Sequence, residues 1–329
     1  MEIRKAETRD VLQIFEFNTL IFPNKKISSK RYLDFWFSKS EDDINNQIIL
    51  VDDDGNVKGQ VLSSSMTYYY KGNRVNTAWI FDLIVDESLR KSAWGIDLLL
   101  KCMEVHPKSC STGSGPTALP IHLKLGNSFF GEIRKYVGVV NPFYFLTSWK
   151  RNAISISKYP NKIHYRNYVF NKIETSGLLP DYDVPFNDDL FEISREKEYL
   201  NWRYFNNLHQ YAFYLSSDGK AYFVLRSILL KGFRVMELVD YRCQIKEVLV
   251  ETIYQAAVGI TKALHLPVLV CGSSLSIVDS VFERHHFKSI GRPRPVIGFV
   301  KCKDRKEDID NRNFCFVTFA DSDGETNWI

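Results

Sequence analysis

The sequence predicts an α/β protein made of two similar halves. Strand-like and helix-like segments alternate over the first 145 residues, and a second set follows after residue 185 in nearly the same order. The length of 329 residues also exceeds that of a usual single domain. We therefore expect an internal duplication of architecture, although little residue identity connects the halves.

The first half contains hairpins, a central strand and a long amphipathic helix. Residues 53–56, Asp-Asp-Gly-Asn, predict the turn of a hairpin. Apolar residues spaced three and four apart after Trp94 indicate a helix with one buried face. The expected strands are residues 2–5, 48–51, 57–70, 77–85, 109–112 and 136–149, and the expected helices begin at residue 8 and cover 94–105 and 117–125.

The second half repeats the order of hairpin, strand, long helix, strand, helix and strand. The expected strands are residues 211–215, 221–227, 234–241, 267–271 and 294–302, and the expected helices are 195–205, 246–264 and 275–284. Residues 150–185 have the weakest pattern. We place the domains at 1–150 and 186–329, with 151–185 as the connecting segment.

Composition excludes several classes of protein. A hydrophobic content of 45% and a net charge of +4, without a long basic run, argue against a disordered chain and predict no nucleic-acid partner. The six cysteines form no Cys-x-x-Cys pair, so we expect buried free thiols and no metal site. The charged N-terminus and the lack of a long apolar run predict no signal peptide, no membrane-spanning segment and a cytoplasmic protein.

The segment between the strand that ends at Val85 and the helix that begins at Trp94 carries the clearest chemistry. Such a junction presents unpaired N–H groups and the positive end of the helix dipole. Small residues allow a pyrophosphate to approach those groups, and Arg90 adds a positive charge. An ordinary polar loop is the alternative interpretation.

This segment resembles motif A of the GNAT acetyltransferase superfamily, Gln/Arg-x-x-Gly-x-Gly/Ala. Arg90 and Gly95 match the motif, whereas Ala93 replaces its first glycine. Residues 82–85 resemble the family's splayed fourth strand, and 113–126 resemble its motif B. The resemblance covers residues 1–145 and implies tandem GNAT-like domains, each with a mixed, mostly antiparallel central sheet flanked by helices.

The resemblance also implies direct acetyl transfer from acetyl-CoA to an amine, with residues 1–150 as the cofactor-binding domain. It places the pantetheine arm along the strand and the pyrophosphate on the following loop, so the implied cofactor-binding residues are Leu83, Ile84, Val85, Arg90, Lys91, Ser92, Ala93, Trp94, Gly95 and Ile96. We predict Asp82 as the general base. His122 lies four residues before Gly126, where the family places a tyrosine that acts as the general acid. His122 is therefore the candidate general acid. The alternatives are a polar Asp82 hydrogen-bonded to a neighbouring loop and a solvent-facing histidine on a helix.

In the second half, the corresponding segment around Asp240 has no glycine, which predicts a degenerate domain with a structural or substrate-recognition role. Its candidate substrate-binding residues are Arg195, Trp202 and Arg203, with helix packing and surface ion pairs as the alternative. The expected partner is a small-molecule amine, such as an amino sugar. Two other readings remain open: a catalytically decayed binding or scaffold protein, and a Fem-type aminoacyl transferase.

Overall fold

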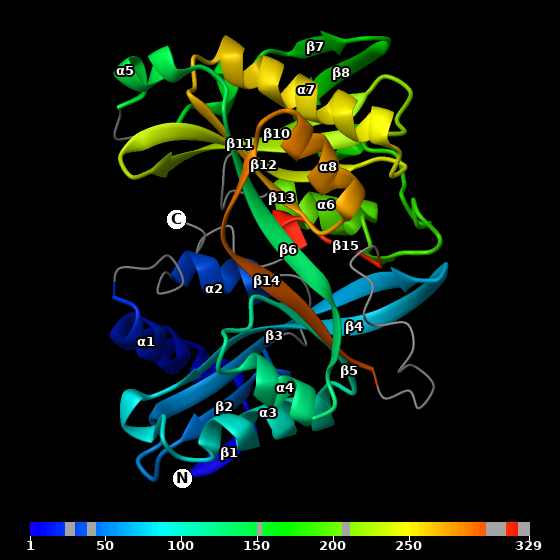
Figure 1. Cartoon of the computed structure of the whole chain (residues 1–329). Coiled ribbons are helices and arrows are strands. Elements are labelled where there is room, and N and C mark those ends of the chain that lie inside the picture. The colour runs from blue at the N-terminus through cyan, green and yellow to red at the C-terminus, as the bar shows by residue number, and fades with distance from the viewer. Residues whose placement is uncertain (24–29, 38–43, 150–152, 206–210, 301–313, 322–329) are drawn as a thin grey trace. The chain divides into compact units, whose positions relative to one another are not determined.

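The computed structural model describes residues 1–23, 30–37, 44–149, 153–205, 211–300 and 314–321 (Figure 1). Contacts divide the chain into two compact units. Unit 1 comprises residues 1–68, 74–130 and 295–310, and unit 2 comprises residues 69–73, 131–294 and 311–329. Among the described residues, no helix is long and apolar enough to cross a membrane.

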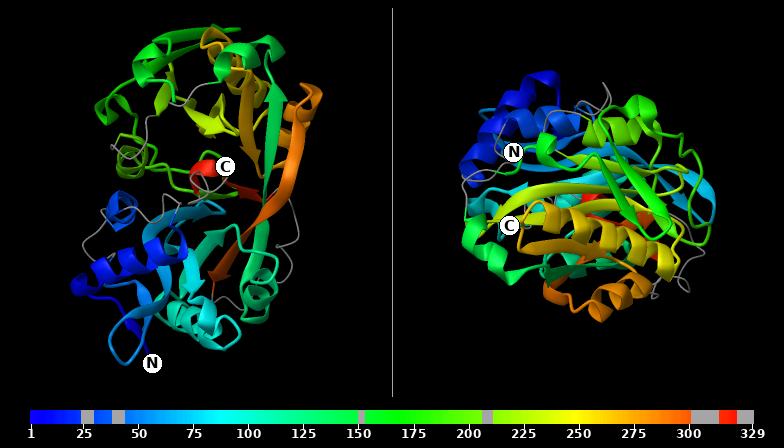
Figure 2. Two further views of the ribbon diagram at one scale, coloured as in Figure 1. Left: turned by 90° about the vertical axis from the view of Figure 1, so that its left-hand side faces the viewer. Right: turned by 90° about the horizontal axis from the view of Figure 1, so that it is seen from above.

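Unit 1 contains a sheet in which β1 to β5 follow one another in chain order. The β1–β2 and β2–β3 pairs are antiparallel, whereas β4 and β5 are parallel. Helices α1 and α2 lie on one face of this sheet, and α3 and α4 lie on the other (Figure 2). The elements are β1 (Glu2–Lys5), α1 (Val11–Ile21), α2 (Lys30–Phe37), β2 (Ile48–Val51), β3 (Val57–Tyr70), β4 (Asn73–Val85), α3 (Trp94–Val105), β5 (Lys108–Thr112) and α4 (Leu119–Lys124).

Apolar side chains on alternate positions of the strands build the core of unit 1. Val61 on β3 and Ala78 on β4 pack against Leu98 and Cys102, which lie one turn apart on α3. The opposite face of β3 carries Gln60, whose amide donates to Asn18 Oδ1 of α1 at 2.8 Å. The predicted helix 94–105 and the predicted strands 48–51 and 57–70 are confirmed.

In unit 2 the strand order is β6-β13-β12-β11-β10-β8-β7, in which β12 and β13 are parallel. Helices α7 and α8 pack on one face of this sheet, and Tyr204 of α6 meets the ring of Phe213 on the other. The elements are β6 (Ser128–Val139), α5 (Phe145–Ser148), β7 (Lys162–Tyr165), β8 (Tyr168–Ile173), β9 (Phe191–Ile193), α6 (Lys197–Tyr204), β10 (Ala212–Ser216), β11 (Tyr222–Leu230), β12 (Phe233–Arg242), α7 (Glu247–Ala263), β13 (Val268–Ser273), α8 (Ser276–Arg284), β14 (Lys288–Val300) and β15 (Cys315–Phe316).

The last strand of each half pairs with the other half of the sequence. The prediction that residues 136–149 close the first sheet is wrong, because β6 pairs with β13 in unit 2 and ends at Val139. Unit 1 instead takes the C-terminal part of β14, which pairs with β5 through Val296 and Thr112. The contacts thus divide the chain differently from the expected boundaries at 150 and 185, and residues 162–173 form strands rather than a linker.

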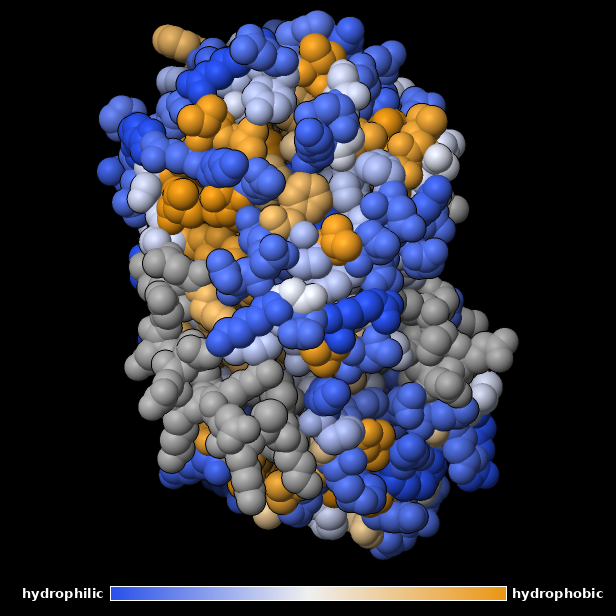
Figure 3. Space-filling view, turned by 90° about the vertical axis from the view of Figure 1, so that its right-hand side faces the viewer, coloured by the Kyte–Doolittle hydropathy of each residue, from blue (hydrophilic) through white to orange (hydrophobic). Residues whose placement is uncertain are grey.

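Hydrophilic side chains predominate on the face shown in Figure 3, with a group of apolar side chains toward the upper left of that view. The described cysteines follow the expectation of buried free thiols: Cys102, Cys110, Cys243, Cys271 and Cys315 are all buried and unbridged. Burial raises the pKa of the Cys102 thiol to about 12, so the thiol stays protonated and behaves as a small apolar side chain. Cys302 lies outside the described residues.

Candidate functional site

The parallel strands β4 and β5 separate in the middle of unit 1. Their register contains only Ala78 with Ser109 and Trp79 with Cys110, although β4 continues to Val85 and β5 to Thr112. Two parallel strands that stop pairing leave backbone groups without their ladder partners, and these groups must be satisfied in another way. The predicted splayed strand is thus present.

A bulge in β4 accompanies this separation. Asp82 has a φ of +50°, which a non-glycine residue rarely adopts within a strand. Before it, the even-numbered Ala78 and Ile80 face the core under α3; after it, the odd-numbered Leu83 and Val85 do. The bulge therefore reverses which of the alternating side chains face α3 over the last residues of β4.

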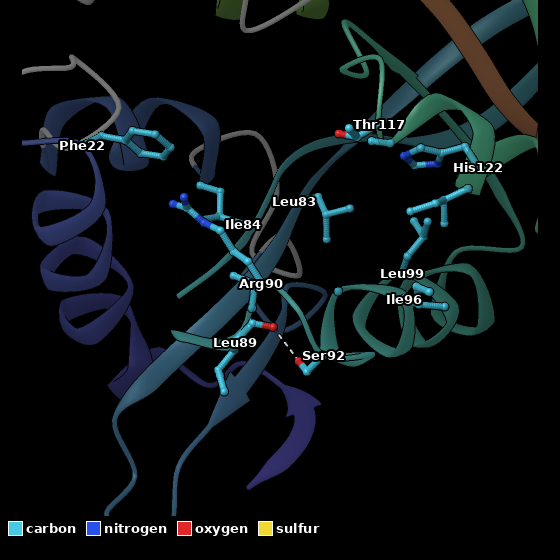
Figure 4. Close-up of a pocket in the computed structure, with 14 residues that line it drawn as sticks. Phe22, Leu83, Ile84, Leu89, Arg90, Ser92, Ile96, Leu99, Thr117 and His122 are labelled. Carbon is cyan, nitrogen blue, oxygen red and sulfur yellow. Dashed lines mark hydrogen bonds between the residues drawn. The ribbon is translucent and has the colours of Figure 1, made fainter. Parts of the chain in front are cut away.

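A pocket of about 470 Å³ lies beside the separated end of β4. Figure 4 shows Leu83 in its middle, Phe22 on the side of α1 and His122 on the side of α4. Its wall is mainly apolar and comprises Phe22, Leu83, Ile84, Val85, Leu89, Arg90, Ser92, Gly95, Ile96, Leu99, Thr117, Ala118, Ile121 and His122. Its size and its apolar wall with few polar groups are those of a small-molecule site.

The loop before α3 is folded by its own hydrogen bonds. Asp86 Oδ1 accepts from the backbone N–H of Ser88 at 2.9 Å and from its hydroxyl at 2.6 Å, and these bonds hold the pKa of the Asp86 carboxyl below its usual value. The N–H groups of Ile96 and Asp97 both donate to the carbonyl oxygen of Ala93. These bonds fix the start of the helix.

Three N–H groups at this helix start remain available for an anion. Within the described part of the chain, those of Lys91, Ala93 and Gly95 have no hydrogen-bond acceptor, whereas that of Trp94 is 3.4 Å from Ser92 Oγ. The 12-residue helix α3 adds the positive end of its dipole. The side chain of Arg90, which lies 3.7 Å from Glu87, is half exposed beside the pocket.

Most of the predicted cofactor-binding residues share this pocket. Seven line it, whereas Lys91, Ala93 and Trp94 do not, and Trp94 packs instead against the core under α3. Gly95 needs no unusual backbone angle, and a Cβ there would meet only Val85 at 3.5 Å. The chain itself therefore leaves space beside Gly95 that a ligand can occupy.

Sequence reasoning missed six of the fourteen residues in the pocket wall. The missed residues are Phe22, Leu89, Leu99, Thr117, Ala118 and Ile121. Gly95 and Leu99, like Ala118 and His122, lie four residues apart, so the helical period could have identified Leu99 and Ala118 once Gly95 and His122 were chosen. Phe22 gives no such signal, because it comes from the end of α1.

The two predicted catalytic residues have different positions. His122 is buried and lines the pocket, so a solvent-facing position for it is wrong. Its Nδ1 has no hydrogen-bond partner among the described residues, and burial lowers the pKa of its imidazole, which is therefore neutral near pH 7. Asp82 is half-buried at the bulge and is not part of the pocket wall.

The corresponding place in unit 2 is filled by the chain itself. The register of β12 with β13 ends at Leu238 and Cys271, and the C-terminal segment 315–321 lies beside the ends of both strands. Thr318 Oγ1 donates to Asp240 at 2.8 Å, and the N–H of Val317 donates to Ser274 Oγ at 2.9 Å. In unit 2 this segment occupies the place that corresponds to the open pocket of unit 1.

The predicted substrate-binding residues lie within this packed region. Helix α6 begins at Lys197, so Arg195 lies before the helix and the expected helix start at residue 195 is wrong. Arg195 is 2% exposed and donates to both carboxylate oxygens of Asp240 and to Asp321 at 2.7 Å. Trp202 is half-buried, and buried Arg203 lies 5.9 Å from its ring. Both guanidinium groups are thus withdrawn from solvent.

Replacing Arg195 with Met should lower the free energy of unfolding by about 3–5 kcal/mol, because two buried carboxylates would lose their shared cation. Urea denaturation measures the change. Arg9→Met is the control: Arg9 pairs with Glu7 on the surface, and its loss should cost less than about 1 kcal/mol. Equal, small losses in both variants would contradict a structural role for Arg195.

The neutral state of His122 predicts a pH dependence of stability. Because the folded state lowers its pKa, only the unfolded chain takes up a proton as the pH falls below about 6.5, so this residue's contribution to stability is lost there. His122→Phe should therefore lose less stability than the parent between about pH 7 and pH 5. Denaturation at several pH values provides the test, and parallel curves for both proteins would refute the assignment.

Comparisons with known proteins agree on the fold. No family model matches the sequence, and a search of curated proteins found no relative. Among solved structures, an N-acetyltransferase of the GCN5-related group from Anabaena variabilis is 11% identical with a TM-score of 0.58, covering 90% of this chain and 72% of its own. A putative acetyltransferase from Pyrococcus horikoshii is 11% identical with a TM-score of 0.56, covering 96% and 94%.

Saccharomyces cerevisiae N-myristoyltransferase with bound myristoyl-CoA is also similar: it is 12% identical with a TM-score of 0.55, covering 91% of this chain and 82% of the enzyme. Identities this low show a likeness of architecture alone. The chain therefore has the fold of the GCN5-related N-acetyltransferases.

Proposed function

We propose that this protein is an acyl-CoA-dependent N-acyltransferase that uses acetyl-CoA and transfers the acetyl group directly to an amine, such as an amino sugar. The observation that carries the proposal is the pocket where β4 leaves β5, because it lies beside the start of α3, where three N–H groups have no acceptor among the described residues. A pyrophosphate suits such a helix start.

The pocket is consistent with the rest of an acyl-CoA. The apolar side chains of Leu83, Ile96 and Ile121 suit a pantetheine arm, and Arg90 adds a positive charge near the phosphates. Similar solved structures include one of an N-myristoyltransferase with bound myristoyl-CoA. In unit 2 the corresponding place beside β12 and β13 is filled by residues 315–321, which supports one acyl-CoA site in each chain.

Acyl transfer needs two proton movements. The amine nitrogen forms a bond to the thioester carbon, the carbon–sulfur bond breaks, a base accepts the proton that the amine loses, and the departing thiolate receives a proton. Asp82 remains the proposed base and His122 the proposed acid. Since His122 lines the pocket and is neutral, it can also accept the amine proton itself, whereas Asp82 would act through an intervening group.

A decayed binding protein is the second candidate. Two departures from the motif pattern favour it: Ala93 in place of a glycine and His122 in place of a tyrosine. Ala93 has a φ of −78°, which any residue adopts, and its N–H remains available. The substitution therefore leaves the anion-binding geometry intact, which favours a working acyl-CoA site. A Fem-type aminoacyl transferase would need a surface for tRNA, and the net charge of +4 gives that reading little support.

Gly95→Leu should weaken acetyl-CoA binding by at least about tenfold, because its side chain would fill the space beside Val85. Gly95→Ala should also bind less tightly, while the helix gains about 0.5–1 kcal/mol of stability. Isothermal titration calorimetry and thermal unfolding measure the two effects. Gly177→Leu, at an exposed glycine with a negative φ in unit 2, is the control and should bind as the parent does. Absence of binding by the parent would defeat the proposed function, and unchanged binding by Gly95→Leu would defeat the site.

Separate variants distinguish the two proton-transfer residues. His122→Phe and Asp82→Asn should each retain acetyl-CoA binding, and the residue that moves the proton should lose about 10²–10⁴-fold in kcat. Thiol release from acetyl-CoA with a panel of amines and amino sugars measures turnover. Unchanged turnover in His122→Phe would remove His122 from the chemistry, and a kcat loss in Asp82→Asn without a change in the pH profile would indicate a structural role for Asp82.

A further inference from the structure

Large apolar side chains stand in solvent at one end of unit 2. Phe143 is 76% exposed, Leu146 is 84% exposed and Trp149 is 66% exposed, and all three belong to α5 or its flanking residues. Val139 at the end of β6 is 59% exposed beside them in sequence. We call these four residues the apolar patch. Isolated apolar residues on a surface are common, but a group of this kind marks an interaction site.

The backbone that carries the apolar patch packs against β12. Trp149 forms a bridge with Phe233 of β12, and their ring centroids are 4.8 Å apart. Phe145 packs edge-on against the same Phe233 ring at 5.3 Å. At Gly232 a Cβ would lie 3.1 Å from the indole, so this glycine allows the ring to cover the β11–β12 turn. The exposed side chains are therefore presented on an ordered support.

A pocket of about 460 Å³ adjoins the patch, between α5 and the C-terminal end of α7, which lie close together in Figure 1. The rings of Tyr144 and His265 meet there edge to face at 5.1 Å. Its wall comprises Phe143, Tyr144, Thr147, Ser148, Arg234, Leu264, His265 and Leu266. Cationic and hydroxyl groups in one small pocket suit a phosphate.

The charge around the patch has one sign. The segment that carries the patch, 139–149, and the two that pack against it, 227–236 and 258–268, contain Lys231, Arg234, Lys262 and His265 and no aspartate or glutamate. A second copy of the chain, docked face to face, would bring Lys231, Arg234 and Lys262 of both copies together, and such like-charge contacts are costly. The partner must instead combine an apolar interior with negative charge at its surface.

We propose that this end of unit 2 docks on an anionic lipid bilayer. Phe143, Leu146 and Trp149 enter the interfacial region, where aromatic rings are favoured, and Lys231 and Lys262 face the phosphates. One lipid headgroup phosphate occupies the pocket beside Arg234 and His265. The contact is peripheral, since its apolar part is a single short helix with its flanking residues.

Sedimentation with vesicles tests the proposal on the full chain. Vesicles of phosphatidylcholine containing about one third phosphatidylglycerol should bind the protein, binding should weaken as salt rises, and phosphatidylcholine alone should bind far less. Replacing both Lys231 and Lys262 with glutamine should reduce the partition coefficient between vesicle and solution about five-fold for each charge removed. Changing Phe143 and Leu146 together to serine should reduce it by at least about tenfold.

The controls carry matched changes elsewhere on unit 2. Val248→Ser removes an exposed apolar side chain from α7, and Lys220→Gln with Lys288→Gln removes two exposed cations. These variants should bind vesicles as the parent does. Equal loss in control and patch variants, or equal binding to neutral and anionic vesicles, would overturn the proposal. The proposal would also be overturned if the parent protein did not bind vesicles but formed dimers that the Leu146→Ser change dissociates. Acetyl-CoA titration of the patch variants should be unchanged, which separates this proposal from that of acyl transfer.

Discussion

The separation of β4 from β5 is the constraint on which the rest of unit 1 depends. A parallel pair normally continues its hydrogen bonds to the end of both strands, but here the pairing stops after Trp79 and Cys110. The bulge at Asp82 bends β4 away and exchanges the two sets of alternating side chains. As a result, Leu83 and Val85 face α3, and the loop that follows places the N-terminus of α3 beside the separated ends of β4 and β5.

In unit 2 the parallel strands also separate, but the chain's own side chains fill the space beside them. Its strands β12 and β13 also stop pairing early, yet Asp240 at the end of β12 is enclosed by Arg195, Thr318 and the hydroxyls of Tyr204 and Tyr222. A buried carboxylate is tolerated only with such partners. The C-terminal segment supplies Thr318 and Asp321, so the chain provides internally what a ligand would provide in unit 1.

The pocket of unit 1 combines groups of opposite character over a short distance. The start of α3 and Arg90 form a hydrophilic, positively charged end, whereas Leu83, Leu99 and Ile121 form an apolar wall. His122 lies in that wall with a lowered pKa, because its imidazole has little solvent around it. A ligand that is anionic at one end and apolar along its length fits this arrangement, and an acyl-CoA has those properties.

The sequence by itself determined the local elements and the loop. The helical period from Trp94 to Val105 and the hairpin turn at residues 53–56 act through neighbours in the chain, so the pattern alone located α3, β2 and β3. The resemblance to motifs A and B pointed to eight residues of the pocket wall. Only the tertiary structure decided which strands pair. The exchange of β6 and β14, the contribution of Phe22 and the burial of Arg195 by Asp321 depend on contacts between residues far apart in sequence, and no local propensity encodes such contacts.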